Sequence, residues 1–303
     1  MKYLVTGGAG FIGSNLVEKL IEKRKKVIVL DNLSTGSLKN LSSIKDKIEL
    51  IVAPVMKVLK IKKIKKLDGI FHLGIPSTTP LYRKNPLLVG ESVNEFIKVL
   101  ELAKREKAKL IFVSSSSIYN GNKTPFKEDF PILAKDFYTE ARYLMERLAK
   151  VYYDFYGVKS IGFRLFSVYG PREEAKKDFA NLVSQFLWKM KKGKSPVIYG
   201  DGRQTRDFIY VEDVVRGLIM AMKSNIDFDI FNLGTGKSYN LNQLIKILDK
   251  IFGKNIKPIY IKNPIKNYVQ DTLADVKKAK KKLGFEAKIS LKEGIKKLIA
   301  KNL

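Results

Sequence analysis

The sequence predicts an α/β protein in which a doubly wound parallel sheet is followed by a smaller C-terminal domain. In the first half of the chain, short apolar segments alternate with amphipathic helical segments, as they do in repeated βαβ units. After about residue 170 this alternation loosens into helical stretches that are separated by turns rich in Gly and Asn. With 303 residues, 45% of them hydrophobic, the chain can bury a core in each part.

The expected elements follow in order along the chain. The strands are short apolar runs: Lys2–Thr6, Val27–Leu30, Ile48–Val52, Gly69–Leu73, Leu110–Ser114 and Ser160–Phe166. The helices show a 3.6-residue period: Phe11–Ile21, Leu87–Lys104, Tyr138–Tyr156, Ala180–Lys191, Val214–Met222 and Leu241–Ile251. Ser290-Leu-Lys-Glu293 is typical of a capping box and predicts a last helix. We expect domains at 1–166 and 167–303, with some later segments returning to the first.

The composition excludes several kinds of chemistry. The chain has no cysteine, which rules out disulfides, thiolate metal sites and cysteine nucleophiles. Its single histidine, His72, leaves few ligands for a transition metal, so no metal site is expected. The N-terminus lacks the apolar core of a signal peptide, and no run approaches the ~20 apolar residues of a membrane span. These features predict a soluble, cytoplasmic protein without a membrane partner.

The formal charge of +28 raises the question of nucleic-acid binding. However, only ten of the 58 basic residues are arginines, and the lysines are spread along the whole chain. The densest stretches, 57–66 and 277–282, have the pattern of solvated helix faces, and this lysine-rich composition also fits a thermophile. We therefore expect no specific nucleic-acid partner, and we interpret the charge as attraction for an anionic small-molecule substrate.

A glycine-rich loop joins the first expected strand to the first expected helix. Gly8, Gly10 and Gly13 match G-x-G-x-x-G, while Gly7, Gly10 and Gly13 match the related G-x-x-G-x-x-G. Such glycines let the backbone approach a pyrophosphate at a helix N-terminus. Asp31 ends the next strand, where a carboxylate accepts hydrogen bonds from ribose hydroxyls and repels a 2′-phosphate, so NAD is expected over NADP. The expected NAD contacts here are Gly7, Gly10, Phe11, Ile12, Gly13, Asp31 and Asn32.

Two later segments carry candidate catalytic groups. Phe112–Gly121 is a strand end that runs into four consecutive serines, and Tyr138-Thr-Glu-Ala-Arg142 places a tyrosine and an arginine on one helix face. With the glycine loop, the chain resembles the extended short-chain dehydrogenase/reductases, specifically the nucleotide-sugar epimerases and dehydratases. The resemblance covers nearly the whole chain, through Phe71-His-Leu73, Arg164–Arg172, Tyr199–Asp213, Asn232–Gly236 and Leu273-Ala-Asp275.

This resemblance implies a Rossmann domain and assigns roles to individual residues. Tyr138 is implied as the base that deprotonates a sugar hydroxyl, and Ser115 as its hydroxyl partner. Arg142 stands where the family has a lysine that binds the nicotinamide ribose and stabilises the phenolate; arginine keeps the charge but is planar and bulkier. Leu73, Ser114, Tyr138, Arg142 and Phe166 are further implied NAD contacts. The implied substrate contacts are Ser115, Ser116, Ser117, Ser167, Arg206 and Lys266.

The residues determine the fold more closely than they determine the reaction. The Gly-Asp that usually contacts adenine is replaced by Ala53-Pro54, and Ser116 and Ser117 occupy the positions of the Asp-Glu pair of 4,6-dehydratases. We therefore expect epimerisation at C4 of a nucleotide-sugar that is UDP-linked, of the UDP-glucose/UDP-galactose type. The alternatives are a catalytically impaired relative that binds NAD or a nucleotide-sugar, and a 4,6-dehydratase or other oxidoreductase. A homodimer formed through helices 87–104 and 138–156 is also implied.

Overall fold

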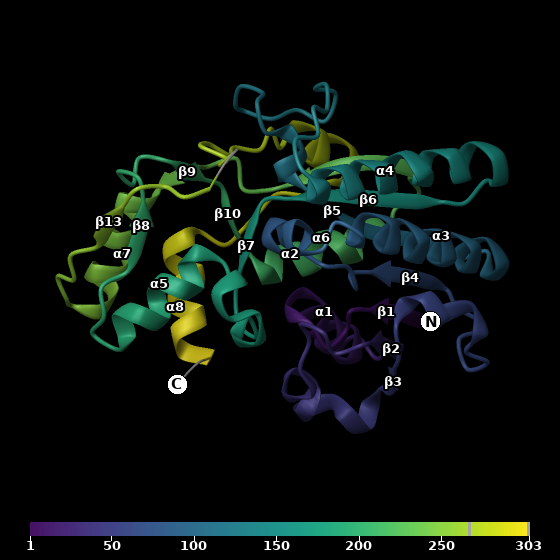
Figure 1. Cartoon of the computed structure of the whole chain (residues 1–303). Helices are drawn as coiled ribbons and strands as arrows, with labels where there is room; N and C mark the ends of the chain where they lie inside the picture. The colour runs from purple at the N-terminus through teal and green to yellow at the C-terminus, as the bar shows by residue number, and fades with distance from the viewer. Residues whose placement is uncertain (266–267, 302–303) are drawn as a thin grey trace.

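A seven-stranded parallel sheet forms the centre of the larger lobe in the computed structural model, which describes residues 1–265 and 268–301 (Figure 1). Its strand order is β11-β6-β5-β4-β1-β2-β3, and every neighbouring pair is parallel. The strands are β1 (Lys2–Thr6), β2 (Lys26–Asp31), β3 (Glu49–Val52), β4 (Gly69–His72), β5 (Lys109–Ser115), β6 (Ser160–Leu165) and β11 (Phe228–Leu233). The predicted doubly wound parallel fold is confirmed.

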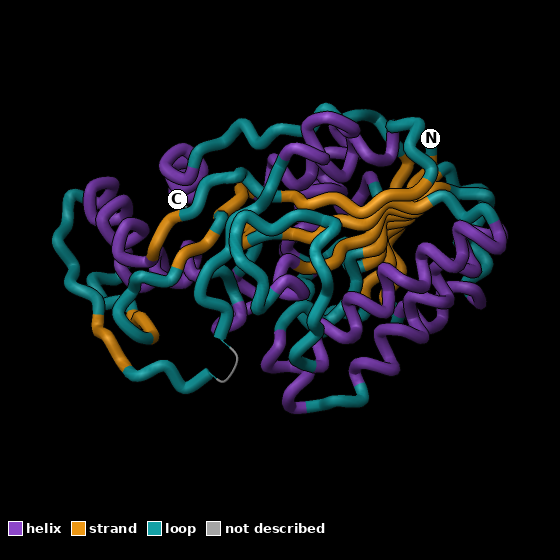
Figure 2. The backbone as a smooth tube through the Cα atoms, turned by 90° about the horizontal axis from the view of Figure 1, so that it is seen from above, coloured by secondary structure: helices purple, strands orange, loops and turns teal. Residues whose placement is uncertain are grey.

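Helices cover both faces of this sheet, as Figure 2 shows. On one face α1 (Phe11–Glu22) packs against α6 (Val211–Lys223), and on the other α3 (Leu88–Glu106) packs against α4 (Phe137–Tyr156). The strands are apolar along their length because both faces are covered; Leu4, Val29 and Ile111 are completely buried. The helices supply complementary apolar stripes, so one continuous core runs through the lobe.

A smaller lobe has its own apolar core. It contains α5 (Leu182–Lys191), α7 (Leu241–Phe252), α8 (Leu291–Lys301) and the parallel pair of β8 (Val197–Tyr199) and β13 (Ile259–Ile261). Trp188 on α5 is partly buried against this core. At the start of α8 the Glu293 N–H donates to Ser290 Oγ and the Ser290 N–H donates to Glu293 Oε2, both at 3.3 Å, so the predicted capping box is present.

The chain passes between the lobes several times after residue 166. The short strands β7 (Ser167–Tyr169) and β10 (Phe208–Tyr210) pair in parallel, and β9 (Thr205–Arg206) pairs with β12 (Tyr239–Asn240) in antiparallel fashion. Between β10 and β12 in the sequence, the chain returns to the larger lobe to form α6 and β11. β11 had not been expected from the sequence, because Asp229 and Asn232 interrupt its apolar pattern.

Most predicted helices differ from the structure by one to three residues at an end. The expected start at Val214 lies three residues inside α6, which begins at Val211 because Glu212 and Asp213 occupy its first turn, where acidic side chains complement the helix dipole. Among the described residues, no helix is long and apolar enough to cross a bilayer.

Candidate active site

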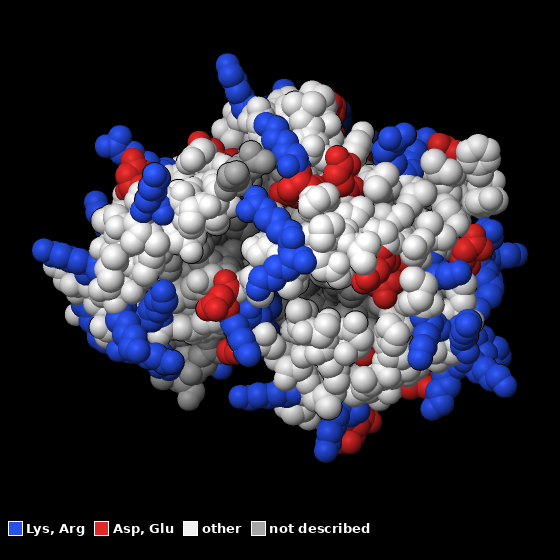
Figure 3. Space-filling model, viewed as in Figure 1, with Lys and Arg blue, Asp and Glu red and all other residues white. Residues whose placement is uncertain are grey.

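A cavity of about 670 Å³ opens at the carboxyl ends of β1 and β4, where the strand order reverses. Ligands of doubly wound sheets bind at this position, because the connections leave the two strands in opposite directions. The space-filling view shows a hollow between the lobes with lysine and arginine side chains around it (Figure 3). The cavity is lined by residues of the larger lobe and by Lys176, Phe179 and Asn181, which lead into α5.

The glycine loop forms one wall of this cavity. Gly7 has a left-handed backbone with φ of 67°, and a Cβ there would lie 2.6 Å from Gly74 Cα. A Cβ on Gly13 would overlap the carbonyl oxygen of Gly7. Gly7, Gly10 and Gly13 line the cavity, whereas a Cβ on Gly8 would meet the buried side chain of Val29. The G-x-x-G-x-x-G pattern is therefore the one that shapes the cavity.

Asp31 lies at the end of β2 beside this loop and is almost fully buried. Its Oδ2 accepts a hydrogen bond from the Ala9 N–H at 2.9 Å, and its Oδ1 accepts one from the Leu33 N–H at 2.7 Å. These two bonds fix the carboxylate and leave lone pairs on both oxygens. Asn32 also lines the cavity, so a ribose near Gly10 could be recognised from this side.

Tyr138 reaches the opposite wall from the first turn of α4. Asp136 caps this helix: its Oδ1 accepts from the Thr139 N–H at 2.9 Å, and Thr139 Oγ1 accepts from the Asp136 N–H at 3.2 Å. The Tyr138 ring packs edge-on against Tyr82, with 5.6 Å between ring centroids. The capping box and this contact hold Tyr138 in place, and Ser115, Ser116 and Ser117 at the end of β5 line the same cavity.

Arg142 lies one helical turn after Tyr138 and is buried beneath it. Its guanidinium carbon is 4.9 Å from the centroid of the Tyr138 ring. One terminal nitrogen donates to the Val113 carbonyl at 3.2 Å and the other donates to the Pro76 carbonyl at 2.8 Å. Within the described residues its Nε has no partner. Arg142 thus keeps a positive charge at the position of the family lysine, with two of its nitrogens engaged by backbone carbonyls.

His72 lies behind this wall and is completely buried at the end of β4. Its Nδ1 is 2.8 Å from Thr6 Oγ1. Burial, reinforced by the positive charge of Arg142, lowers the pKa of His72 to about 3. His72 is therefore neutral at physiological pH, and it does not belong to the residues that line the cavity.

A family model described as "NAD dependent epimerase/dehydratase family" matches residues 3–234. The chain belongs to this family. Its cofactor is NAD, and the expected family resemblance is confirmed.

The relatives of this chain differ in the reactions that their names state. The chain is 38% identical over 302 residues to the "Putative UDP-glucose 4-epimerase" of Methanocaldococcus jannaschii, covering 98% of this chain and 96% of that protein. It is 34% identical to UDP-glucuronic acid decarboxylase 1 of Arabidopsis thaliana, covering 99% of this chain and 69% of that protein. The structure of the Thermotoga maritima UDP-glucose 4-epimerase with UDP-glucose superposes with a TM-score of 0.93, at 34% identity, covering 99% and 98% of the two chains.

The structure brings most of the predicted site residues of this epimerase/dehydratase into one cavity. Those that line it are Gly7, Gly10, Phe11, Ile12, Gly13, Asp31, Asn32, Leu73, Ser114, Ser115, Ser116, Ser117, Tyr138, Arg142, Phe166 and Ser167. The Ser114 hydroxyl is buried without a hydrogen-bond partner among the described residues. These predictions concern binding and catalysis, and they remain predictions.

Two predicted substrate residues are placed differently. Arg206 does not line the cavity; its guanidinium donates to the carbonyls of Thr205, Val269 and Gln270 at 2.7 to 2.9 Å and stacks on Tyr268. The Arg206 guanidinium therefore fixes the segment 268–270 rather than the cavity wall. Lys266 lies outside the described residues.

Several cavity residues were missed by sequence reasoning. Thr78 belongs to the loop after β4, Thr79 begins α2 (Thr79–Lys84), and Glu91 and Glu95 come from α3. Lys176 reaches the Phe11 ring, with its Nζ 5.5 Å from the centroid. The helical period predicted a buried stripe on α3 but could not show that Glu91 and Glu95, one turn apart, face a cavity.

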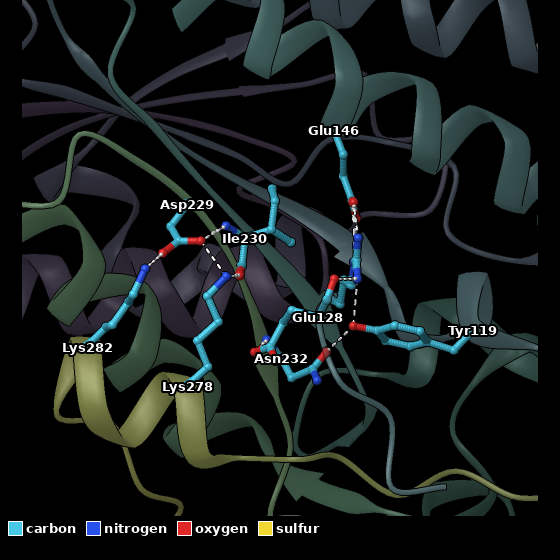
Figure 4. A network of polar contacts seen from close by, with 9 residues as sticks. Tyr119, Glu128, Glu146, Asp229, Ile230, Asn232, Lys278 and Lys282 are labelled. Atoms are coloured by element: carbon cyan, nitrogen blue, oxygen red, sulfur yellow. Dashed lines mark hydrogen bonds and ion pairs between the residues drawn. The ribbon is translucent and has the colours of Figure 1, made fainter. Parts of the chain in front are cut away.

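A buried polar network supports the Tyr138 helix from behind (Figure 4). Arg164 on β6 donates to Glu146 on α4, at 2.6 Å in the shortest contact, and to the Tyr119 hydroxyl at 2.7 Å. The Tyr119 hydroxyl donates in turn to Asn232 Oδ1 on β11 at 2.8 Å. Because Arg164 and Glu146 are both almost fully buried, this network fixes α4 against β6 and β11.

Proposed function

We propose that this protein epimerises a UDP-hexose at C4, with UDP-glucose and UDP-galactose as the first pair to test. One observation carries the proposal: Tyr138, the serines at the end of β5 and the glycine loop all line a single cavity. The glycine cradle, where side chains would clash, and the fixed carboxylate of Asp31 fit a dinucleotide. Residues 167–303 are proposed to supply most contacts to the nucleotide-sugar.

The chemistry assigned to the protein is proton transfer and positioning. NAD, when bound, supplies the acceptor for a hydride from C4 and the donor for its return. Tyr138 takes the proton from the C4 hydroxyl and gives it back, while Ser115 hydrogen-bonds the same oxygen and holds it near the phenol. A phenol is a poor base at neutral pH unless a cation stabilises its anion, and the buried guanidinium of Arg142 lies 4.9 Å from the centroid of the Tyr138 ring.

The residues beside Ser115 favour epimerisation over dehydration. Elimination of water across C5 and C6 requires a further acid and base, and the positions after Ser115 hold Ser116 and Ser117. Hydroxyls at these positions can bind sugar oxygens but cannot serve as an acid-base pair. The choice of UDP is supported by the names of the relatives, which act on UDP-sugars.

The test is incubation with NAD and a panel of UDP-, dTDP- and GDP-sugars in deuterated water, followed by proton NMR. A new epimer without deuterium is expected, because the hydride leaves and returns without exchange. A 4-keto-6-deoxy product, a pentose from UDP-glucuronate, or deuterium at C3 or C5 would each contradict the proposal.

The alternative of a catalytically impaired binder rests on Arg142, whose two terminal nitrogens are already engaged. The same panel of sugar nucleotides applied to Arg142→Lys distinguishes an active epimerase from an impaired binder. If the wild type produces an epimer, the impaired-binder reading is excluded. If only the lysine variant does, the natural chain is a binder.

We also propose a homodimer formed through α3 and α4. An apolar stripe along α4 is exposed in the single chain: Phe137, Leu144, Val151 and Phe155 are 37% to 77% exposed. Such a stripe is typical of a helix that packs against a partner. Light scattering should give twice the chain mass of 34.5 kDa, and a monomer would overturn this part of the proposal.

A further inference from the structure

The adenosine end of the cavity can be located from the strand register. Asp31 is paired with Val52 at the ends of β2 and β3, and the Ala53 N–H donates to the Asp31 carbonyl at 3.1 Å. The chain then turns through Pro54, and Val55 lines the cavity. Of Ala53, Pro54 and Val55, only Val55 lines the cavity, and none of these three side chains carries a hydrogen-bond acceptor.

A carboxylate from another element lies at this end. Glu95 belongs to α3, which packs against the segment Val55–Lys60, and it lines the cavity. Its Oε1 accepts a hydrogen bond from the Met56 N–H at 3.3 Å. This bond ties Glu95 to the residue next to Val55, and among the described residues it is the only hydrogen bond that the Glu95 side chain makes. Burial raises the pKa of Glu95. The nearby Glu91 raises this pKa further, and the hydrogen bond from the Met56 N–H lowers it.

We infer that Glu95 is the acceptor for the 6-amino group of the NAD adenine. The inference rests on the proposed placement of the adenine ribose at Asp31. The base then extends past the ribose toward Val55, and its amino edge needs an acceptor, since a buried donor without one is unfavourable. Ala53 and Pro54 offer no such side chain, and Glu95, which crosses from α3 to the same wall, does. Glu95 is thus a specificity residue for the base of the cofactor.

The test uses two dinucleotides that differ at this atom. NAD carries a 6-amino group, and nicotinamide hypoxanthine dinucleotide carries a carbonyl oxygen in its place. The protein is dialysed to equilibrium against equal concentrations of both, and the bound nucleotides are quantified by chromatography. The wild type should retain about ten times more NAD than hypoxanthine analogue. The Glu95 carboxylate accepts a hydrogen bond from the 6-amino group of NAD, whereas with the analogue it meets the 6-carbonyl oxygen, which is also an acceptor.

Glu95→Gln should abolish this preference or reverse it, because a carboxamide can donate to the 6-carbonyl oxygen while its own oxygen still accepts from Met56. Glu140→Gln is the matched control: Glu140 is exposed on α4, does not line the cavity, and should leave the wild-type ratio unchanged. A circular dichroism melt of each variant shows that it is folded.

The inference is overturned if the wild type retains both nucleotides equally, or if Glu95→Gln keeps the wild-type ratio. These outcomes leave the proposed function standing when the wild type still binds NAD and forms an epimer. If the wild type retains neither nucleotide, the proposed cofactor placement fails, and the assignment of Glu95 fails with it.

Discussion

Tyr138 and Arg142 occupy one helical turn, and their contacts define what each can do. The phenol faces the cavity, whereas the guanidinium lies behind the ring and donates to two backbone carbonyls. In our proposal Arg142 therefore acts on the phenolate through its charge, and its Nε is buried without a hydrogen-bond partner among the described residues. A lysine would have carried its charge on a single rotatable group.

Replacing the phenol tests its role directly. Tyr138→Phe should lower kcat for epimerisation by about 10²- to 10⁴-fold, the usual contribution of a general acid-base group. NAD affinity should change little, because the ring and its packing against Tyr82 are retained. Tyr143→Phe on the same helix is the control, since Tyr143 does not line the cavity. A Tyr138→Phe enzyme with wild-type kcat would remove Tyr138 from the mechanism.

His72 makes stability depend on pH in a defined direction. Its pKa is lowered from 6.5 to about 3 in the folded protein. Between these values the unfolded chain binds a proton that the folded chain does not, so stability falls as pH decreases, by up to about 1.4 kcal/mol per pH unit. In urea unfolding at pH 7 and pH 4.5, His72→Asn should be less stable at pH 7 but should lose less on acidification. An equal loss in both proteins would contradict this assignment.

The sequence predicted the residues that line the cavity where they belong to short local motifs. The glycine loop, Asp31, the β5 serines and Tyr138 all belong to such local patterns, and all line the cavity. Arg206 and Glu95 could not be placed this way. The carbonyls that engage Arg206 include those of residues 63 and 64 positions away, and Glu95 meets Met56 across 39 positions.

At the scale of elements, the N-cap of α4 lies two residues before Tyr138, so in our proposal the same cap contributes to stability and to catalysis. Asp136→Ala removes the acceptor for the Thr139 N–H and should lower the free energy of unfolding by about 1 kcal/mol. The first turn would then fray, and kcat should fall as well, because Tyr138 loses its fixed orientation.

Asp136→Asn preserves the cap, since asparagine caps as well as aspartate does, and should restore both properties. Guanidinium unfolding and steady-state kinetics on the three proteins provide the comparison. A loss of stability without any change in kcat would show that the cap does not position Tyr138.

The pattern of elements shows which parts of a fold the sequence determines locally. Strands β1 to β5 have uninterrupted apolar centres and β6 carries one charged residue, Arg164, and all six were predicted within one residue at each end. β11 was not, because Asp229 forms ion pairs with Lys278 and Lys282, and Asn232 belongs to the Tyr119 network (Figure 4). Polar residues on this edge strand find partners from distant segments, and a local pattern cannot reveal them.

At the scale of the whole molecule, the cofactor should contribute to stability. NAD at a concentration 100 times its Kd should add about 2.7 kcal/mol to the free energy of unfolding, because it binds only the folded chain. NADP at the same concentration should stabilise much less, since its 2′-phosphate would meet the carboxylate of Asp31.

Thermal melts with each nucleotide measure this difference. Asp31→Ser provides the comparison, because it removes the charge and should narrow the gap between the two cofactors. Equal shifts of Tm by NAD and NADP in the wild type would contradict the proposed role of Asp31.

The position of Trp188 gives the molecule an intrinsic optical label. It is the one tryptophan in the sequence, and it sits on α5 against the core of the smaller lobe. Emission excited at 295 nm therefore reports on that lobe alone, whereas far-ultraviolet dichroism averages over both. α5 follows directly on Asn181, which lines the cavity. The folding of the smaller lobe can thus be compared with the average over both lobes, and the binding of the sugar nucleotide that we propose should change the same emission, with no dye attached.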